Sequence, residues 1–131
     1  MTNIELMEHW IESAENDYKA MKNLYHSNDY SWCLFVGHLV IEKLLKGLYA
    51  KLNVQEPFAP KTHNLLTLAK KCDLALDDDK VETLSRITRF NMSARYDDAK
   101  QDFNKLCTQE YTEGQIENIE ELRKWLKVKL I

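Results

Sequence analysis

The segment from Trp32 to Leu52 constrains the fold more than any other part of the chain, because it is apolar on almost every side. Its polar side chains His38, Glu42 and Lys46 recur at steps of four, which places them above one another on a helix. A helix that is apolar nearly all round is typical of the interior of a bundle. Because an unpaired buried charge is costly, the carboxylate and the ammonium group of this polar stripe need partners. We therefore expect a buried central helix whose polar stripe is the first place to look for function.

The rest of the chain also favours helices. Glycine occurs only 3 times and proline only twice in 131 residues, which disfavours a fold with many turns. Apolar residues recur at helical spacing in four further segments, which we expect to form helices at about 3–26, 63–72, 77–95 and 112–130. We predict an all-α fold, a four- to five-helix and mainly up-and-down bundle that forms a single domain over residues 1–131.

Capping residues suggest where these helices begin. The expected N-terminal residues are Thr2 (with Glu5), Thr62, the acidic run 77–79 and Thr112 (with Gln115). The segment 53–61 contains both prolines and reads as the one substantial loop, whereas the segment 96–109 is mixed and polar, typical of a connection or a broken helix.

Several classes of function lack their sequence motifs. The chain has no His-Glu-x-x-His and no Glu-x-x-His pair, so we expect no metal site. It has no glycine-rich phosphate loop and no nucleophile elbow, so we expect no cofactor. Its formal net charge is -3, so binding to phosphates would need a local basic surface rather than the charge of the whole chain.

The cysteines and the hydropathy predict a location. Cys33, Cys72 and Cys107 are widely spaced and form no Cys-x-x-Cys pair, and free thiols suit a reducing cytoplasm. We expect Cys33 to be a small core residue. Charged residues interrupt the longest apolar run, so we expect no membrane span, and the basic and apolar pattern of a signal peptide is missing at the N-terminus. The prediction is a cytoplasmic protein.

Three short motifs occur in a fixed order after a first helix that carries Trp10, Ala14, Asp17 and Ala20. They are Glu-Lys-Leu-Leu-Lys at 42–46, Thr-His-Asn-Leu at 62–65 and Ala-Arg-Tyr-Asp at 94–97. Each motif alone is weak, but together, in a chain of this length, they resemble the HEPN family of small helical domains. The resemblance covers essentially the whole chain.

This resemblance implies a helical bundle that forms a homodimer. It also implies a minimal nucleotidyltransferase as partner in a toxin–antitoxin pair, and a nucleotide or RNA as ligand. Several family members are metal-independent RNases that use an arginine followed four to six residues later by a histidine, and Arg95 aligns with that arginine. In this chain every histidine lies at or before His63 and every arginine at or after Arg86, so the RNase motif is absent.

The candidate site residues follow from the stripe and the resemblance together. The predicted ligand-binding residues are Glu42, Lys43, Lys46, His63, Arg95 and Tyr96. No residue is assigned as catalytic; Arg95, His63 and Tyr96 are the candidates, because RNA cleavage without metal needs an acid–base group that titrates near neutral pH.

Two structural interpretations stand beside these assignments. Arg95 either holds a phosphate or pairs with Glu42 or Asp17 inside the bundle, and the sequence favours the pairing because buried acids need partners. Asp17 lies on the apolar side of the first helix, so we predict a hydrogen bond to a basic or backbone donor across the helix interface.

These observations leave three hypotheses. The first is a module that binds a nucleotide, an RNA or a partner nucleotidyltransferase without catalysis. The second is an RNase toxin that uses Arg95 with His63 or Tyr96 in place of the usual histidine. The third is a purely structural dimerisation bundle.

Overall fold

The structure, a computed structural model, describes residues 1–131 except for the side chain of Asp98, and its regular elements are helices. They are α1 (Asn3–His26), α2 (Tyr30–Leu52), α3 (Leu65–Lys71), α4 (Asp78–Arg95), α5 (Asp97–Leu106) and α6 (Gln109–Leu130). The all-α prediction is confirmed, but the chain has six helices rather than four or five. The additional helix is α5, in the segment that the sequence left as a connection or a broken helix. Tyr96 separates it from α4 with an extended backbone.

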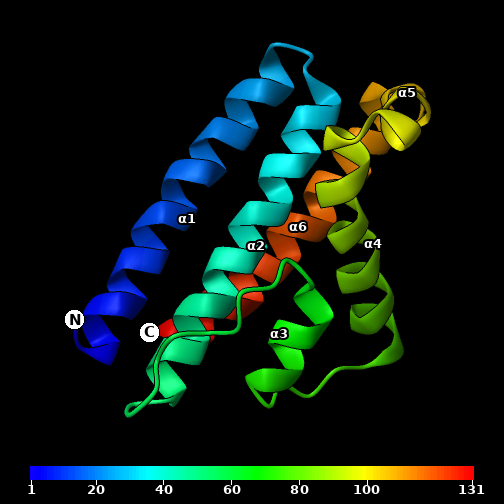
Figure 1. The fold of residues 1–131 in the computed structure, drawn as a ribbon. Helices are drawn as coiled ribbons and strands as arrows, with labels where there is room; N and C mark the ends of the chain where they lie inside the picture. The colour runs from blue at the N-terminus through cyan, green and yellow to red at the C-terminus, as the bar shows by residue number, and fades with distance from the viewer.

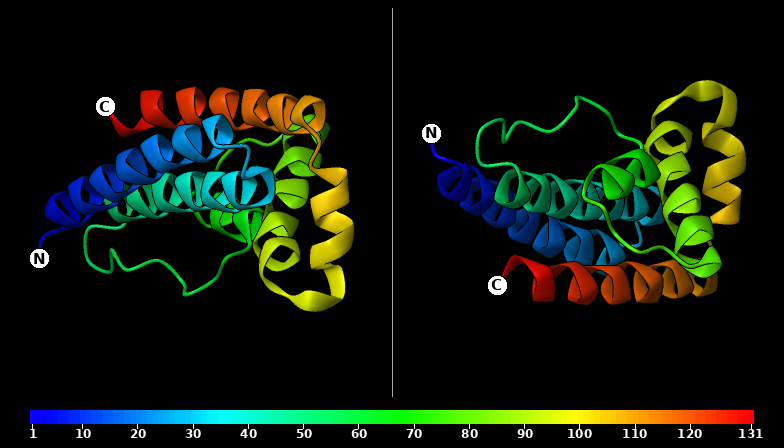
Figure 2. Two further views of the ribbon diagram at one scale, coloured as in Figure 1. Left: turned by 90° about the horizontal axis from the view of Figure 1, so that it is seen from above. Right: turned by 90° about the horizontal axis from the view of Figure 1, so that it is seen from below.

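The helix α2 occupies the centre of the bundle, as its apolar sequence predicts. It packs against α1, α3, α4 and α6, and α1 and α2 form an antiparallel pair (Figure 1). The two termini lie at one end of the long helices, and α5 lies at the other (Figure 2). The short helix α3 packs against α2 and α4 after the long loop that follows α2.

The close packing of α2 depends on a glycine. A Cβ atom built on Gly37 would lie 2.5 Å from Cδ1 of Ile119 on α6, which is closer than carbon atoms pack. Gly37 therefore lets α2 and α6 pack closely, and a larger residue would require the end of the Ile119 side chain to move.

Two helix starts were predicted correctly. The hydroxyl of Thr2 accepts a hydrogen bond from Glu5 N, as the predicted cap should, and the carboxylate of Asp77 accepts one from Lys80 N. Both side chains satisfy an amide that has no partner inside the helix; for the acidic run 77–79 the sequence predicted the helix start from its charge and did not predict the cap.

Capping was predicted wrongly at two others. The N-cap of α3 is Asn64, not Thr62, because the hydroxyl of Thr62 accepts from Asn64 N and so forms a tight turn before the helix. The last helix begins one turn before Thr112, since Thr108 accepts from Tyr111 N and Thr112 is fully buried inside α6.

The three cysteines lie in the interior, and Cys33 is a core residue as predicted. Burial raises the pKa of Cys33 and Cys72 to about 12 and that of Cys107 to about 11. The thiols are therefore protonated at neutral pH and poorly suited to act as nucleophiles. None of the helices in the described part of the chain is long and apolar enough to cross a membrane.

Candidate functional site

The polar stripe of α2 divides into a buried part and an exposed part. Glu42 is buried in the C-terminal half of the helix. Its carboxylate binds one side chain from α2 and one from the loop before α3. His63 donates from Nδ1 to Oε1 over 2.7 Å, and Lys46 donates from Nζ to Oε2 over 3.2 Å. Lys46 also lies over the ring of Trp10 on α1, 5.4 Å from its centroid. We call Glu42, Lys46, His38 and His63 the carboxylate cluster.

His38 ties the loop before α3 to the central helix. Its Nε2 donates to the backbone carbonyl of His63 over 2.7 Å, and the two imidazole rings lie 6.2 Å apart. His38 is fully buried, and its Nδ1 has no hydrogen-bond partner among the described residues. The cluster thus fixes both the backbone and the side chain of His63 against α2.

The ring of His38 is kept neutral by its surroundings. Burial lowers the pKa of His38 below its ordinary value of 6.5, and the positive charge of Arg95 acts in the same direction. Glu42, whose Oε1 lies 3.9 Å from Nε2, and the bond to the His63 carbonyl oppose this shift. Arg95, at the C-terminal end of α4, lies against Phe35, three residues before His38 on α2.

Arg95 does not pair with Glu42 or Asp17, so the interpretation favoured by the sequence is wrong. The carboxylate of Glu42 is already held by His63 and Lys46, whereas Arg95 donates to the backbone carbonyl and the side-chain amide of Asn91, one turn earlier on α4. These bonds are local, and the guanidinium group remains exposed.

Two aromatic rings lie against this arginine, one partly buried and one exposed. Its guanidinium carbon lies 5.5 Å from the ring centroid of Phe35 and 5.3 Å from that of Tyr96. Next to them, Nζ of Lys100 on α5 lies 5.4 Å from the ring of Trp32, which packs edge to face against Phe35. We call these five residues the aromatic–cation face. Phe35 and Trp32 continue the stripe of α2 by about one and two turns toward its N-terminus, since 32, 35, 38, 42 and 46 follow at steps of three and four.

Asp17 and Lys43 belong to another interface. Nζ of Lys43 lies 2.6 Å from a carboxylate oxygen of Asp17, and both side chains are mostly buried between α1 and α2. Asp17 therefore faces a basic group across the helix interface, as predicted, but the oxygen nearest to Lys43 makes no hydrogen bond to the described residues. Lys43 faces away from the stripe, so the geometry gives it a structural role instead of the ligand-binding role that we expected.

The predicted site residues therefore separate into three groups. Glu42, Lys46 and His63 are together in the carboxylate cluster, Arg95 and Tyr96 lie on the aromatic–cation face, and Lys43 is elsewhere. Sequence reasoning missed Trp32, Phe35 and Lys100. The step of three between the two aromatic residues was a readable signal, but Lys100 comes from a segment with no recognisable pattern.

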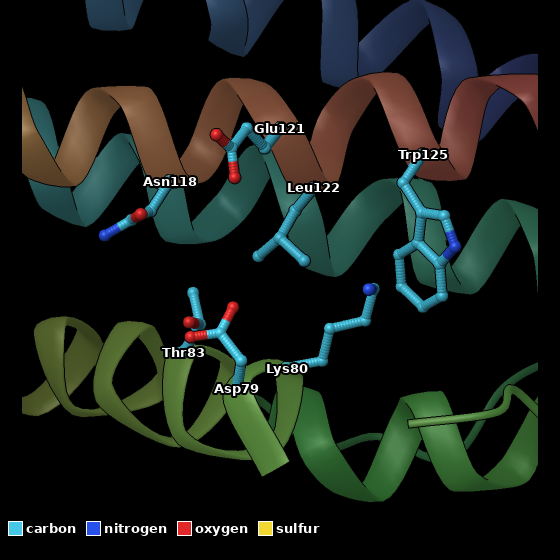
Figure 3. A pocket seen from close by; sticks show the side chains of 7 residues that line it. All are labelled: Asp79, Lys80, Thr83, Asn118, Glu121, Leu122 and Trp125. Atoms are coloured by element: carbon cyan, nitrogen blue, oxygen red, sulfur yellow. The ribbon is translucent and has the colours of Figure 1, made fainter. Parts of the chain in front are cut away.

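A hollow of about 120 Å³ lies between α4 and α6 and is another candidate site. Figure 3 shows the residues that line it: Asp79, Lys80 and Thr83 from α4, and Asn118, Glu121, Leu122 and Trp125 from α6. The ammonium group of Lys80 already lies over the ring of Trp125, 5.1 Å from its centroid. The carboxylates of Asp79 and Glu121 disfavour a phosphate here, so this hollow is a poorer candidate than the aromatic–cation face.

A comparison with known families agrees with the resemblance. The family model described as the HEPN domain matches residues 7–129, which is nearly the whole chain. The chain belongs to the HEPN domain family. This membership supports a nucleotide- or RNA-related module. No curated protein and no solved structure matches the chain.

Proposed function

We propose that this HEPN domain binds single-stranded RNA or a nucleotide through the aromatic–cation face and does not cleave it. The observation that carries the proposal is the exposure of two rings beside two cations. Trp32 and Tyr96 are 39% and 50% exposed, and Lys100 and Arg95 lie against them.

This combination of rings and cations suits the binding of a nucleic acid without sequence specificity. Bases stack on exposed aromatic rings, contributing about 1–3 kcal/mol for each base. Arg95 and Lys100 supply the charge that phosphate groups require, and the planar guanidinium group can hold a phosphate through two parallel hydrogen bonds. The net charge of -3 means that binding would depend on this local surface, so we expect modest affinity that falls steeply with salt.

The carboxylate cluster has a supporting role in this proposal. Glu42 and Lys46 satisfy each other inside the bundle, so they hold the loop before α3 in place rather than contact a ligand. The side chain of His63 is 59% exposed while its Nδ1 is bonded to Glu42, so its other ring nitrogen can reach a ligand at the rim of the face.

The homodimer and the nucleotidyltransferase partner enter the proposal from the family resemblance. A dimer would present two such faces and would strengthen binding to a longer RNA through avidity. Light scattering of the purified protein measures its mass, and co-purification with a nucleotidyltransferase encoded beside it would test the second partner.

One observation favours the RNase alternative enough to include it in the test. Arg95 lies against Phe35 and His63 lies against His38, and these two residues are one turn apart on α2. The fold thus places an arginine and a partly exposed histidine against neighbouring turns of one helix, although the order of the two residues in the chain is the reverse of the family motif. Arg95 would hold the phosphate and His63 would take the proton of the attacking 2′-hydroxyl group.

The deciding experiment measures binding and cleavage on the same samples. A fluorescently labelled ten-nucleotide RNA is titrated with the protein at low salt, and its anisotropy is recorded. Arg95→Ala should weaken binding about tenfold. It should also reduce the slope of log affinity against log salt concentration by about one, the value for one lost phosphate contact. Arg89→Ala is the matched control, because it removes the same charge from an exposed position on another side of α4 and should change affinity less than about twofold.

The samples are then analysed on a denaturing gel. Intact RNA with tight binding supports the proposal. Cleavage that disappears in both Arg95→Ala and His63→Ala would replace it with the RNase alternative. Equal losses of RNA affinity in Arg95→Ala and Arg89→Ala would mean that binding depends on overall charge and not on the aromatic–cation face.

A further inference from the structure

A cavity of about 340 Å³ adjoins the aromatic–cation face. It lies where the turn between α1 and α2 meets α5, at the end of the bundle away from the termini (Figures 1 and 2). Its walls include Asp29, Ser31, Trp32, Lys100 and Asn104. Trp32 and Lys100 belong to both the cavity and the face, so a ligand on the face can extend into the cavity.

Asp29 at the edge of this cavity is not used as a helix cap. It occupies the N-cap position of α2, where an aspartate normally accepts a hydrogen bond from the first turn of the helix, but its side chain makes no such bond. Its backbone angles, φ -89° and ψ 66°, differ from the extended conformation of Thr2, Asp77 and Thr108, which do cap their helices. One carboxylate oxygen accepts from the hydroxyl of Ser27 over 2.7 Å. The carboxylate therefore lines the cavity with acceptor capacity left over.

Ser31, on the first turn of α2, is the second polar group in the wall. It is only 9% exposed, and its hydroxyl makes no hydrogen bond to any described residue. The hydroxyl oxygen is not among the buried polar atoms that lack a partner, so it is open to the cavity and can exchange hydrogen bonds there with solvent or a ligand. Asn104 on α5 adds an amide to the same wall.

We propose that the cavity receives the ribose of a nucleotide whose base stacks on Trp32, and that Asp29 accepts a hydrogen bond from its 2′-hydroxyl group. Ser31 hydrogen-bonds the sugar, and Lys100 meets the adjoining phosphate. A carboxylate is the acceptor that binds a ribose hydroxyl most strongly, and its charge would otherwise be unfavourable beside a phosphate. The 2′-hydroxyl group distinguishes RNA from DNA, so the protein discriminates between the two. This inference depends on the proposed function, because it names the class of nucleic acid that the same surface binds.

The test compares three ten-nucleotide strands of one sequence, made of RNA, DNA and 2′-O-methyl RNA, by fluorescence anisotropy. The wild-type protein should bind RNA about tenfold more tightly than the other two, as expected for one hydrogen bond to a charged acceptor. In Asp29→Ala the affinity for DNA should be equal or higher, because a negative charge is removed, whereas the preference for RNA should fall to about twofold or less.

Asp78→Ala is the matched control. It removes the same charge at the start of α4, at the other end of the bundle (Figure 1), and should leave the preference for RNA unchanged. Circular dichroism checks that Asp29→Ala folds, as expected for an N-cap whose side chain makes no capping bond.

Each outcome is decisive. Equal binding of RNA and DNA by the wild-type protein, or an unchanged preference in Asp29→Ala, would overturn the ribose site and leave the proposed function standing. Failure to bind any of the three strands would overturn both.

Discussion

Charged groups lie along both parts of the α2 stripe, but their surroundings differ. In the carboxylate cluster, charges are buried and satisfy one another: Glu42 is 4% exposed and is bonded by His63 and Lys46. On the aromatic–cation face, Arg95 is exposed, and among the described residues it donates hydrogen bonds to Asn91 within its own helix. The difference teaches that burial, rather than residue type, separates the charges that hold this fold together from those available to a ligand.

The largest effect should come from breaking the buried part. Glu42→Ala leaves the mostly buried Lys46 without its carboxylate and releases His63 from α2, and we expect a loss of about 3 kcal/mol in the free energy of unfolding. Glu82→Ala is the control: this glutamate pairs with Arg86 four residues on but is 77% exposed, so its loss should cost less than about 0.5 kcal/mol. Urea denaturation measures both. Similar small losses in the two variants would mean that the cluster is not structural.

A smaller effect should appear as a pH dependence. Because the pKa of His38 is lowered in the folded protein, the unfolded chain takes up a proton near pH 6.5 that the folded chain cannot. The free energy of unfolding should therefore be nearly constant above about pH 7.5 and fall as the pH decreases from about 7.5 to about 5.5. His38→Gln keeps a donor for the His63 carbonyl and should flatten this slope, whereas His26→Gln, at the exposed end of α1, should keep it. Parallel slopes in wild type and His38→Gln would show that His38 is not the group responsible.

The smallest effect on stability should come from the exposed part. Arg95→Ala removes only local hydrogen bonds and contacts with rings, so the free energy of unfolding should change by less than about 0.5 kcal/mol while RNA affinity falls. Thermal unfolding followed by circular dichroism measures the first quantity on the same preparation used for binding. A loss as large as that of Glu42→Ala would make Arg95 a structural residue and remove the contrast between the two parts.

Much of the fold was predictable because the information is local. The all-α class, the central position of α2 and the starts of α1 and α4 follow from apolar spacing and from capping residues within a few positions. Helix α5 and the start of α6 were not predicted. Their boundaries depend on Tyr96 adopting an extended conformation and on which of two threonines, Thr108 or Thr112, becomes buried in the bundle.

The candidate site was predicted in part. The grouping of Glu42, Lys46 and His63 was anticipated from the stripe and from the motif order, and so was the need for a partner at Asp17. The partners themselves were not, because an ion pair such as that between Asp17 and Lys43 joins residues 26 positions apart. Lys100 was missed altogether, since only the fold brings α5 against the first turn of α2.

By itself the sequence determined that the chain is helical, that one helix is central with a polar stripe, and that the motifs have the order of the HEPN family. Only the tertiary structure decided that the charges of that stripe are satisfied, and that α4 and α5 bring exposed cations to its N-terminal end. The physical reason is that helical periodicity is set by neighbours three and four residues away, whereas burial is set by helices that are distant in the chain. In this protein, burial by distant helices divides the stripe on α2 into a structural cluster and a proposed binding face.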